Sequence, residues 1–197
     1  MKIYDNIIQG TEEWFQVRLG KFGSSDAQAV ASCGRGLDTI CFQKVAEIII
    51  GKPQESYTNE HIERGIKTES MARSAYEIET GNLVTQVGYI EISDYVGGSP
   101  DGMVKGDGLI EIKCPSDANY IRTIYEGKID SKYIWQMQHL MLITNRKWCD
   151  FVVFNENLDK IRIQRVERDE EAIEKIKVGL ESGERKIKTI LEKVKKG

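Results

Sequence analysis

The feature that most constrains the fold of this chain is a pair of short β-type segments on either side of a glycine-rich turn. Residues 97–102 read Gly-Gly-Ser-Pro-Asp-Gly, and residues 111–113 read Glu-Ile-Lys. Between them, Gly106-Asp107-Gly108 predicts a tight turn, because glycine reaches positive φ without steric cost. The sequence therefore predicts a β-hairpin that brings Asp101 close to Glu111.

The second strand of this hairpin predicts a polar face and an apolar face. Side chains alternate along a strand, so Glu111 and Lys113 share one face while Ile112 points to the other, towards a core. Two carboxylates and an ammonium on one surface suit a hard cation such as Mg²⁺ and a scissile phosphate. We therefore expect a metal-dependent phosphodiester chemistry at this hairpin.

Length and composition set the remaining bounds. A chain of 197 residues suits a single domain spanning 1–197, and no apolar run reaches the roughly 18 residues of a membrane span. The N-terminus has no apolar signal core, and the four cysteines have no zinc-like spacing, which favours a reduced, cytoplasmic setting. The net charge of −3 argues against a nucleic-acid coat protein but not against a nuclease.

Helical and strand patterns predict an α/β fold with a mixed central β-sheet flanked by helices. Capping residues and apolar spacing indicate helices at 11–17, after Ser25, at 39–50, 58–80, 117–126, 132–144 and 169–196. A serine hydroxyl is expected to cap the helix after Ser25. Alternating β-branched residues predict a three-stranded meander over 83–113 and two further strands at 148–154 and 160–166.

Pro100-Asp101 followed by Glu111-x-Lys113 matches the PD-(D/E)xK nuclease signature. Asp101, Glu111 and the backbone carbonyl of Ile112 can hold Mg²⁺, which acts as a Lewis acid and lowers the pKa of bound water. Lys113 can orient that water or stabilise transition-state charge. The alternative is a surface hairpin with ordinary charges, since short motifs also match by chance.

Further segments, in the same order along the chain, resemble the phage lambda exonuclease family, the YqaJ-type viral recombinases. They are Arg18-Leu19-Gly20-x-x-Gly23-Ser24-Ser25, Arg64-Gly65-x-x-x-Glu69-x-x-Ala72-Arg73, Gly98-Ser99-Pro100-Asp101-Gly102, Leu109-x-Glu111-x-Lys113-Cys114-Pro115 and Tyr133-x-x-Gln136-x-Gln138. The combination is far more specific than any one motif.

The resemblance implies a restriction-endonuclease-like fold and Mg²⁺-dependent degradation of the 5′ strand of linear double-stranded DNA, with Mn²⁺ as a substitute cation. It also implies 3′ single-stranded overhangs for phage-type homologous recombination, a single-strand annealing protein as partner, and a ring-shaped homotrimer around the DNA end. The setting it implies is the cytoplasm of a bacterial host, with the gene carried by a phage or prophage.

The resemblance also assigns site residues. Asp101 and Glu111 look like metal ligands, Lys113 like the catalytic lysine, and Glu69 like a helix-borne acid that serves a second metal or its water. Without the resemblance, Glu69 reads as a solvated helix charge. A pocket for the 5′-phosphate is implied at Arg18, Ser25, Ser99 and Gln136. Their alternative roles are a helix-flanking arginine, a helix cap, a turn serine and a structural glutamine.

Other conspicuous residues have structural interpretations. Tyr133 and Gln138 are interpreted as packing or site support, and His139 and His61 as helical histidines rather than metal ligands. The three tryptophans, Trp14, Trp135 and Trp148, are interpreted as core residues, with an aromatic wedge at the DNA end as the alternative. The lysines of residues 186–196 are interpreted as a solvated helix face.

Two competing functions stay open from the sequence. The first is another PD-(D/E)xK DNA nuclease, such as an endonuclease; an iron-sulfur type is disfavoured because only Cys149 lies late in the chain. The second is a non-catalytic DNA-end-binding recombination protein, against which the intact Asp101, Glu111 and Lys113 speak.

Overall fold

The computed structural model describes residues 1–53 and 59–196, and the side chains of 59–67 are left aside. The helices are α1 (Glu12–Arg18), the 3-10 helix η1 (Ser24–Asp26), α2 (Ala27–Ser32), α3 (Arg35–Ile50), α4 (Asn59–Thr80), α5 (Asp117–Glu126), α6 (Ser131–Thr144) and α7 (Glu170–Val194). The strands are β1 (Lys2–Tyr4), β2 (Val84–Thr85), β3 (Tyr89–Ser93), β4 (Val96–Gly98), β5 (Gly102–Val104), β6 (Gly108–Lys113), β7 (Trp148–Asn155) and β8 (Lys160–Glu167). The predicted helices and the strands β7 and β8 are confirmed with shifts at their ends, whereas residues 83–113 form five strands in place of the predicted three, and β1 was not predicted.

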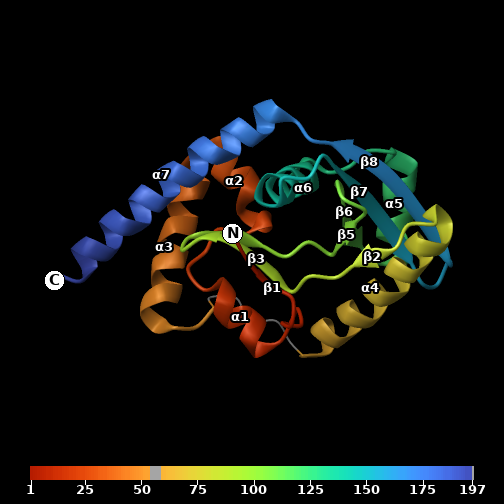
Figure 1. Ribbon diagram of the computed structural model, residues 1–197, viewed down its shortest axis with the longest axis horizontal. Helices are drawn as coiled ribbons and strands as arrows, with labels where there is room; N and C mark the ends of the chain where they lie inside the picture. Colours follow the sequence, from red (N-terminus) through yellow and green to blue (C-terminus); the bar gives the residue numbers. More distant parts are fainter. Residues whose placement is uncertain (54–58, 197) are drawn as a thin grey trace.

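The strands form a mixed five-stranded sheet in the order β2-β5-β6-β7-β8 and a three-stranded sheet in the order β1-β3-β4. β6 and β7 are parallel, while the other neighbours in the larger sheet are antiparallel. Helix α4 packs on one face of this sheet, and α5 and α6 cover the other (Figure 1). The predicted mixed sheet flanked by helices is confirmed.

The predicted meander over residues 83–113 is wrong in its pairing. β3 and β4 pair with each other and with the N-terminal strand β1, whereas β2 pairs with β5. The alternation of apolar residues in this region fits either pairing, because it reports which face is buried and not which strand lies alongside. The chain therefore leaves the smaller sheet at Gly98 and enters the larger one at Gly102.

The hairpin predicted around residues 105–108 is confirmed, and Gly102 is paired with Ile110 and Val104 with Gly108. The positive φ in its turn falls on Lys105, at 49°, and not on Gly106. Gly108 instead lies in β6, where its missing side chain leaves room for Trp148: a Cβ at this position would come within 2.1 Å of the indole ring. The glycines were predicted to supply positive φ in the turn, whereas Gly108 is needed for the close approach of Trp148.

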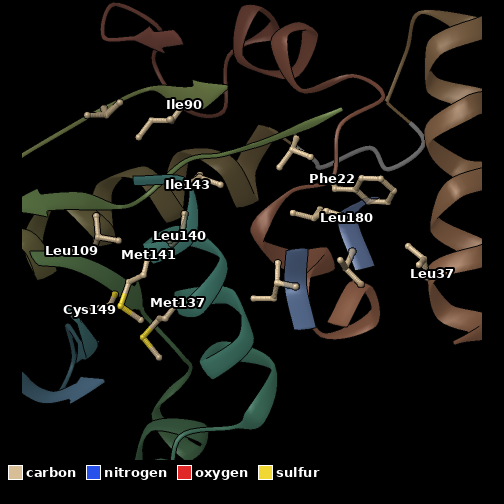
Figure 2. Packing of buried hydrophobic residues seen from close by; sticks show 14 of the residues in the cluster. Phe22, Leu37, Ile90, Leu109, Met137, Leu140, Met141, Ile143, Cys149 and Leu180 are labelled. Atoms are coloured by element: carbon tan, nitrogen blue, oxygen red, sulfur yellow. The ribbon is translucent and has the colours of Figure 1, made fainter. Parts of the chain in front are cut away.

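The main core lies between α6, the two sheets and the helical layer of α2, α3 and α7. Figure 2 shows Met137, Leu140, Met141 and Ile143 of α6 pointing towards Leu109 and Cys149 on one side and Ile90 on another. Phe22, Leu37 and Leu180 extend the same cluster towards α3 and α7. A second cluster, centred on Ala72, Tyr76 and Ile112, joins α4 to the opposite face of the larger sheet.

Helix caps match the sequence in part. Thr11 caps α1, since its hydroxyl oxygen accepts from the Trp14 amide. The predicted serine cap near Ser25 is wrong: α2 begins without a side-chain cap, and Asp26 instead accepts from the Gly23 amide at 2.9 Å. The first residue of the helix predicted at 58–80 lies outside the described residues, and His61 lies among those whose side chains are left aside.

His139 is a core histidine and not a surface one. It is 1% exposed, and neither ring nitrogen has a hydrogen-bond partner in the described part of the chain. Burial alone lowers the pKa of His139 to about 4. Because its usual pKa is about 6.5, the unfolded chain binds a proton more readily than the folded one as the pH falls from 6.5 towards 4.

We therefore expect His139→Leu to remove part of the acid sensitivity of the fold. Linkage sets the penalty from His139 at about 2 kcal/mol at pH 5 and near zero above pH 7.5. Urea unfolding at pH 5 and pH 8 measures the difference between the variant and the original chain. A difference that stays the same at both pH values contradicts a buried neutral imidazole.

None of the helices in the described part of the chain is both long enough and apolar enough to span a bilayer.

Candidate active site

The hairpin of β5 and β6 carries the centre of the site. Asp101 directly precedes β5, and its Oδ2 accepts from the Ile112 amide at 2.6 Å, so the carboxylate lies across the hairpin beside β6. One residue away on β6, the Lys113 ammonium pairs with Glu111 Oε1 at 2.6 Å. Ile112 is buried on the opposite face against α4, as predicted. The structure thus brings Asp101, Glu111 and Lys113 together.

The carboxylates of the site are held where their charged form is unfavourable. Glu111 is 2% exposed, and burial and the nearby Asp101 raise its pKa to about 7 despite Lys113. Burial also raises the pKa of Asp101, against the opposing effect of Lys113. Lys113 is itself desolvated, which disfavours its charge, yet Glu111 and Asp101 together raise its pKa above the usual value. Lys113 therefore stays protonated at any physiological pH.

Helix α4 adds Glu69 and Arg73 to this cluster. Glu69 Oε1 accepts from both terminal nitrogens of Arg73, at 3.2 Å and 3.1 Å, and Arg73 also donates to the backbone carbonyl of Asp101 at 2.5 Å. Burial, followed by repulsion from Asp101, raises the pKa of Glu69 to about 7. Further along α4, Tyr76 donates to Asp150 of β7 at 2.8 Å, which fixes the helix on the sheet.

The donor set suits a hard divalent cation. Desolvated carboxylates with raised pKa values gain most from a cation that neutralises them, and carboxylate oxygens are the ligands that Mg²⁺ prefers. Asp101, Glu111 and the Ile112 carbonyl would be its ligands. Within the described residues, no three His, Cys, Asp or Glu side chains converge into a ready-made metal cluster. The ligands available to a cation are therefore two carboxylates and a carbonyl, while Glu69 is hydrogen-bonded to Arg73.

A second feature lies between α1, η1, α3 and β3. A cavity of about 140 Å³ is lined by Arg18 and Ser25, as well as by Lys21 and Lys44. Two carboxylates, Asp26 and Glu47, also reach it, and Lys44 pairs with Glu47 at 3.5 Å. This small, polar cavity carries three basic and two acidic side chains, and it contains two of the four residues predicted to bind a phosphate group.

Ser99 reaches this cavity only indirectly, through Trp14. The indole of Trp14 donates to Ser99 Oγ at 2.8 Å and to the Gly88 carbonyl at 3.2 Å, while the Arg18 guanidinium stacks on its ring at 3.7 Å. Ser99 in turn donates to the Gly88 carbonyl at 2.7 Å. Trp14 thus links the cavity to a serine two residues before Asp101.

Gln136 is the predicted residue that the structure does not join to the cavity. It lies half-buried on α6, which packs against η1, and its side chain forms no hydrogen bond with the described residues. Its neighbours on α6 have structural contacts: Tyr133 stacks on Phe151 with its ring 5.0 Å from the Lys113 ammonium, and Gln138 accepts from the Asp169 amide. The interpretation of Tyr133 and Gln138 as support is consistent with these contacts.

Two residues of the site were not singled out from the sequence. Trp14 was interpreted as a core residue, and Arg73 was noted only as part of a motif. Charge spacing offered one signal, since Glu69 and Arg73 are four positions apart on a helix and so lie on one face. Nothing in the sequence indicated that Arg73 would also reach the Asp101 carbonyl.

Comparisons with known proteins bear on the family and the fold of the chain. The model of the YqaJ-like viral recombinase domain matches residues 13–147. The structure resembles that of an alkaline exonuclease, LHK-Exo, from Laribacter hongkongensis, with 35% identity, a TM-score of 0.84, and coverage of 94% of this chain and 97% of that one. A structure of LHK-Exo in complex with dAMP matches with 36% identity and the same TM-score and coverage. A comparison with curated proteins gives no match.

A phage-related exonuclease from Haemophilus somnus 129PT shares the fold at 15% identity, with a TM-score of 0.68 and coverage of 88% of this chain and 96% of that one. The fold and the site place the chain among proteins with the alkaline-exonuclease fold. This chain belongs to the YqaJ-like viral recombinase domain family.

Proposed function

We propose that this protein is a Mg²⁺-dependent 5′-to-3′ exonuclease on linear double-stranded DNA that leaves 3′ single-stranded overhangs for recombination by strand annealing. The observation that carries the proposal is the hairpin centre, where Asp101 accepts from the Ile112 amide and the buried Glu111 pairs with the Lys113 ammonium at 2.6 Å. The similarity to LHK-Exo, an alkaline exonuclease, over almost the whole chain supports exonuclease activity.

Each residue of the centre has a distinct task. Asp101, Glu111 and the Ile112 carbonyl would hold Mg²⁺, which supplies Lewis acidity at the phosphate when it is bound. Lys113 stays protonated, so it serves as a hydrogen-bond donor that stabilises the negative charge of the transition state and not as a general base. Glu69 would orient the attacking water or help to hold a second cation.

In the hydrolysis, the water oxygen forms a bond to phosphorus as the bond from phosphorus to the 3′ oxygen breaks. The released nucleotide keeps its 5′-phosphate and gains a 3′-hydroxyl, and the shortened strand again begins with a 5′-phosphate. The cavity at Arg18 and Ser25 binds that terminal phosphate, so each cut regenerates the group by which the next end is recognised.

The deciding experiment follows strand polarity on a linear duplex. We expect loss of label from the 5′ strand only, dependence on Mg²⁺, and no loss with Asp101→Ala. Digestion that begins at the 3′ strand, or that is unaffected by EDTA, would reject the proposed reaction. Cleavage of closed circular DNA at a similar rate would identify an endonuclease, and duplex-end binding without turnover would identify a binding protein.

We expect Arg18→Ala to lower the preference for a 5′-phosphorylated end by roughly tenfold or more, since a charge-assisted hydrogen bond contributes about 1.5–3 kcal/mol. Paired rates on duplexes with and without a 5′-phosphate measure this ratio. Arg185→Ala removes an exposed arginine of α7 and is the matched control. An unchanged ratio in Arg18→Ala would remove this residue from the phosphate site.

The assembly is part of the same proposal. A ring of three subunits would surround the duplex and keep the enzyme on its end, and a single-strand annealing protein would receive the 3′ overhang. Light scattering of the purified protein, with and without a short duplex, measures the subunit number. A monomer under both conditions would reject the ring.

A further inference from the structure

Arg73 connects the two elements that carry the acidic residues of the site. Its guanidinium reaches Glu69 on its own helix and the backbone carbonyl of Asp101 on the hairpin, and its side chain is only 12% exposed. The carbonyl contact does not depend on any charge of Asp101, because a backbone oxygen cannot titrate. Arg73 therefore holds α4 and the Pro100–Asp101 segment in one relative position.

A guanidinium is suited to this task in a way that an ammonium is not. It is planar and has several N–H donors in fixed directions, so it can donate to a carboxylate and to a carbonyl at the same time. A lysine at this position would supply the same charge on a single nitrogen, without the planar arrangement of donors. The two contacts of Arg73 fix the Glu69 carboxylate relative to the backbone from which the Asp101 side chain leaves.

We propose that Arg73 is a positioning residue that pre-organises Glu69 and Asp101 for divalent-cation binding. This inference rests on the proposed function, which places the cation at Asp101 and Glu111. Partners that orient ligating carboxylates typically affect metal affinity by about 10- to 100-fold when they are removed.

The sign of the effect separates this role from simple electrostatics. A positive charge next to a cation site repels the cation, so its removal would tighten binding if Arg73 acted through charge alone. Pre-organisation predicts the opposite: Arg73→Met weakens binding although it removes a repulsive charge. Arg73→Lys keeps the positive charge but loses the planar pair of donors, so it is expected to weaken cation binding as well.

The test is calorimetric titration of Mn²⁺ into the metal-free protein without DNA. We expect roughly tenfold or weaker binding in both Arg73→Met and Arg73→Lys, and no change in Arg122→Met, which alters an exposed arginine of α5. Thermal melting in EDTA verifies that each variant is folded; if Arg73→Met unfolds, Arg73→Lys still gives the answer. Unchanged or tighter binding in the folded variants overturns the inference.

Failure of this inference is distinguishable from failure of the proposed function. If the original chain binds no Mn²⁺ and degrades no linear duplex, the metal-dependent nuclease itself is rejected. If the original chain binds Mn²⁺ and degrades the duplex, while Arg73→Lys binds the cation equally well, only the positioning role is rejected.

Discussion

Glu111→Gln is expected to abolish nuclease activity and, in the same protein, to stabilise the metal-free fold. Glutamine keeps the volume of the side chain and an oxygen that can accept from Lys113, so the local packing is preserved. It removes a charge that the metal ion needs, and metal-based charge stabilisation contributes several kcal/mol. The rate on a linear duplex should fall on the order of 1,000-fold or more.

The gain in stability follows from the raised pKa of Glu111. A carboxyl group with a folded pKa of about 7 and an unfolded value near 4.5 binds its proton more tightly in the fold, so its contribution to stability is complete below pH 4.5 and is lost as the pH rises through 7. At pH 8 in EDTA the ionised, buried Glu111 therefore destabilises the original chain. We expect Glu111→Gln to recover about 1–3 kcal/mol there, and much less at pH 5.

Urea unfolding in EDTA at pH 8 and pH 5, with a duplex-degradation assay alongside, measures both effects. Glu192→Gln, which alters an exposed glutamate of α7, should change neither. Saturating Mg²⁺ should reverse the order of stability, because only the original chain gains from the cation. A Glu111→Gln protein that is less stable than the original at pH 8 without metal contradicts a strained site.

The geometry of the β5–β6 hairpin was predicted correctly because its determinants are local in sequence. Alternation placed Glu111 and Lys113 on one face and Ile112 on the other, and the turn fixed the register that brings Asp101 across. The burial of Glu111 could not be predicted in the same way, since it depends on α6, which covers that face of the sheet. The raised pKa values, and hence the strain at the site, are products of tertiary structure.

The cavity at Arg18 and Ser25, by contrast, is formed by segments that lie apart in the sequence. Arg18 and Ser25 were predicted only through resemblance, because nothing local links a residue before Gly20 to one in η1. In the structure, the segment between Arg18 and Ser25 is fixed beside β4: the Phe22 amide donates to the Tyr95 carbonyl, and the Gly97 amide donates to the Phe22 carbonyl. Trp14 was missed for the same reason: its indole finds Ser99 across a wide sequence separation. Alternation along the strands likewise did not distinguish one continuous meander from two sheets.

Gly179→Ala is expected to destabilise the protein strongly, although alanine is the better helix former. A Cβ at residue 179 of α7 would lie 2.0 Å from the Val30 carbonyl oxygen, which belongs to the backbone of α2 and cannot rotate away. Alanine normally gains about 1 kcal/mol over glycine inside a helix. Overpacking against fixed backbone should outweigh this gain, for a net loss of about 3 kcal/mol or more.

Equilibrium urea unfolding of Gly179→Ala measures this loss, and Val178→Ala, at an exposed position of the same helix, is the control and should change stability by less than about 0.5 kcal/mol. A Gly179→Ala protein as stable as the original would show that α7 can shift away from α2 at no cost.

The effect should extend to function, because Gly183 on the same face of α7 packs against Phe22, and a Cβ there would come within 2.5 Å of that ring. Phe22 is hydrogen-bonded through its backbone to Gly97, just before Ser99 and Asp101. Displacing α7 therefore disturbs the cavity at Arg18 and the hairpin centre together, and we expect the phosphate preference and the cleavage rate to fall in parallel in this variant, whereas Arg18→Ala lowers the preference selectively.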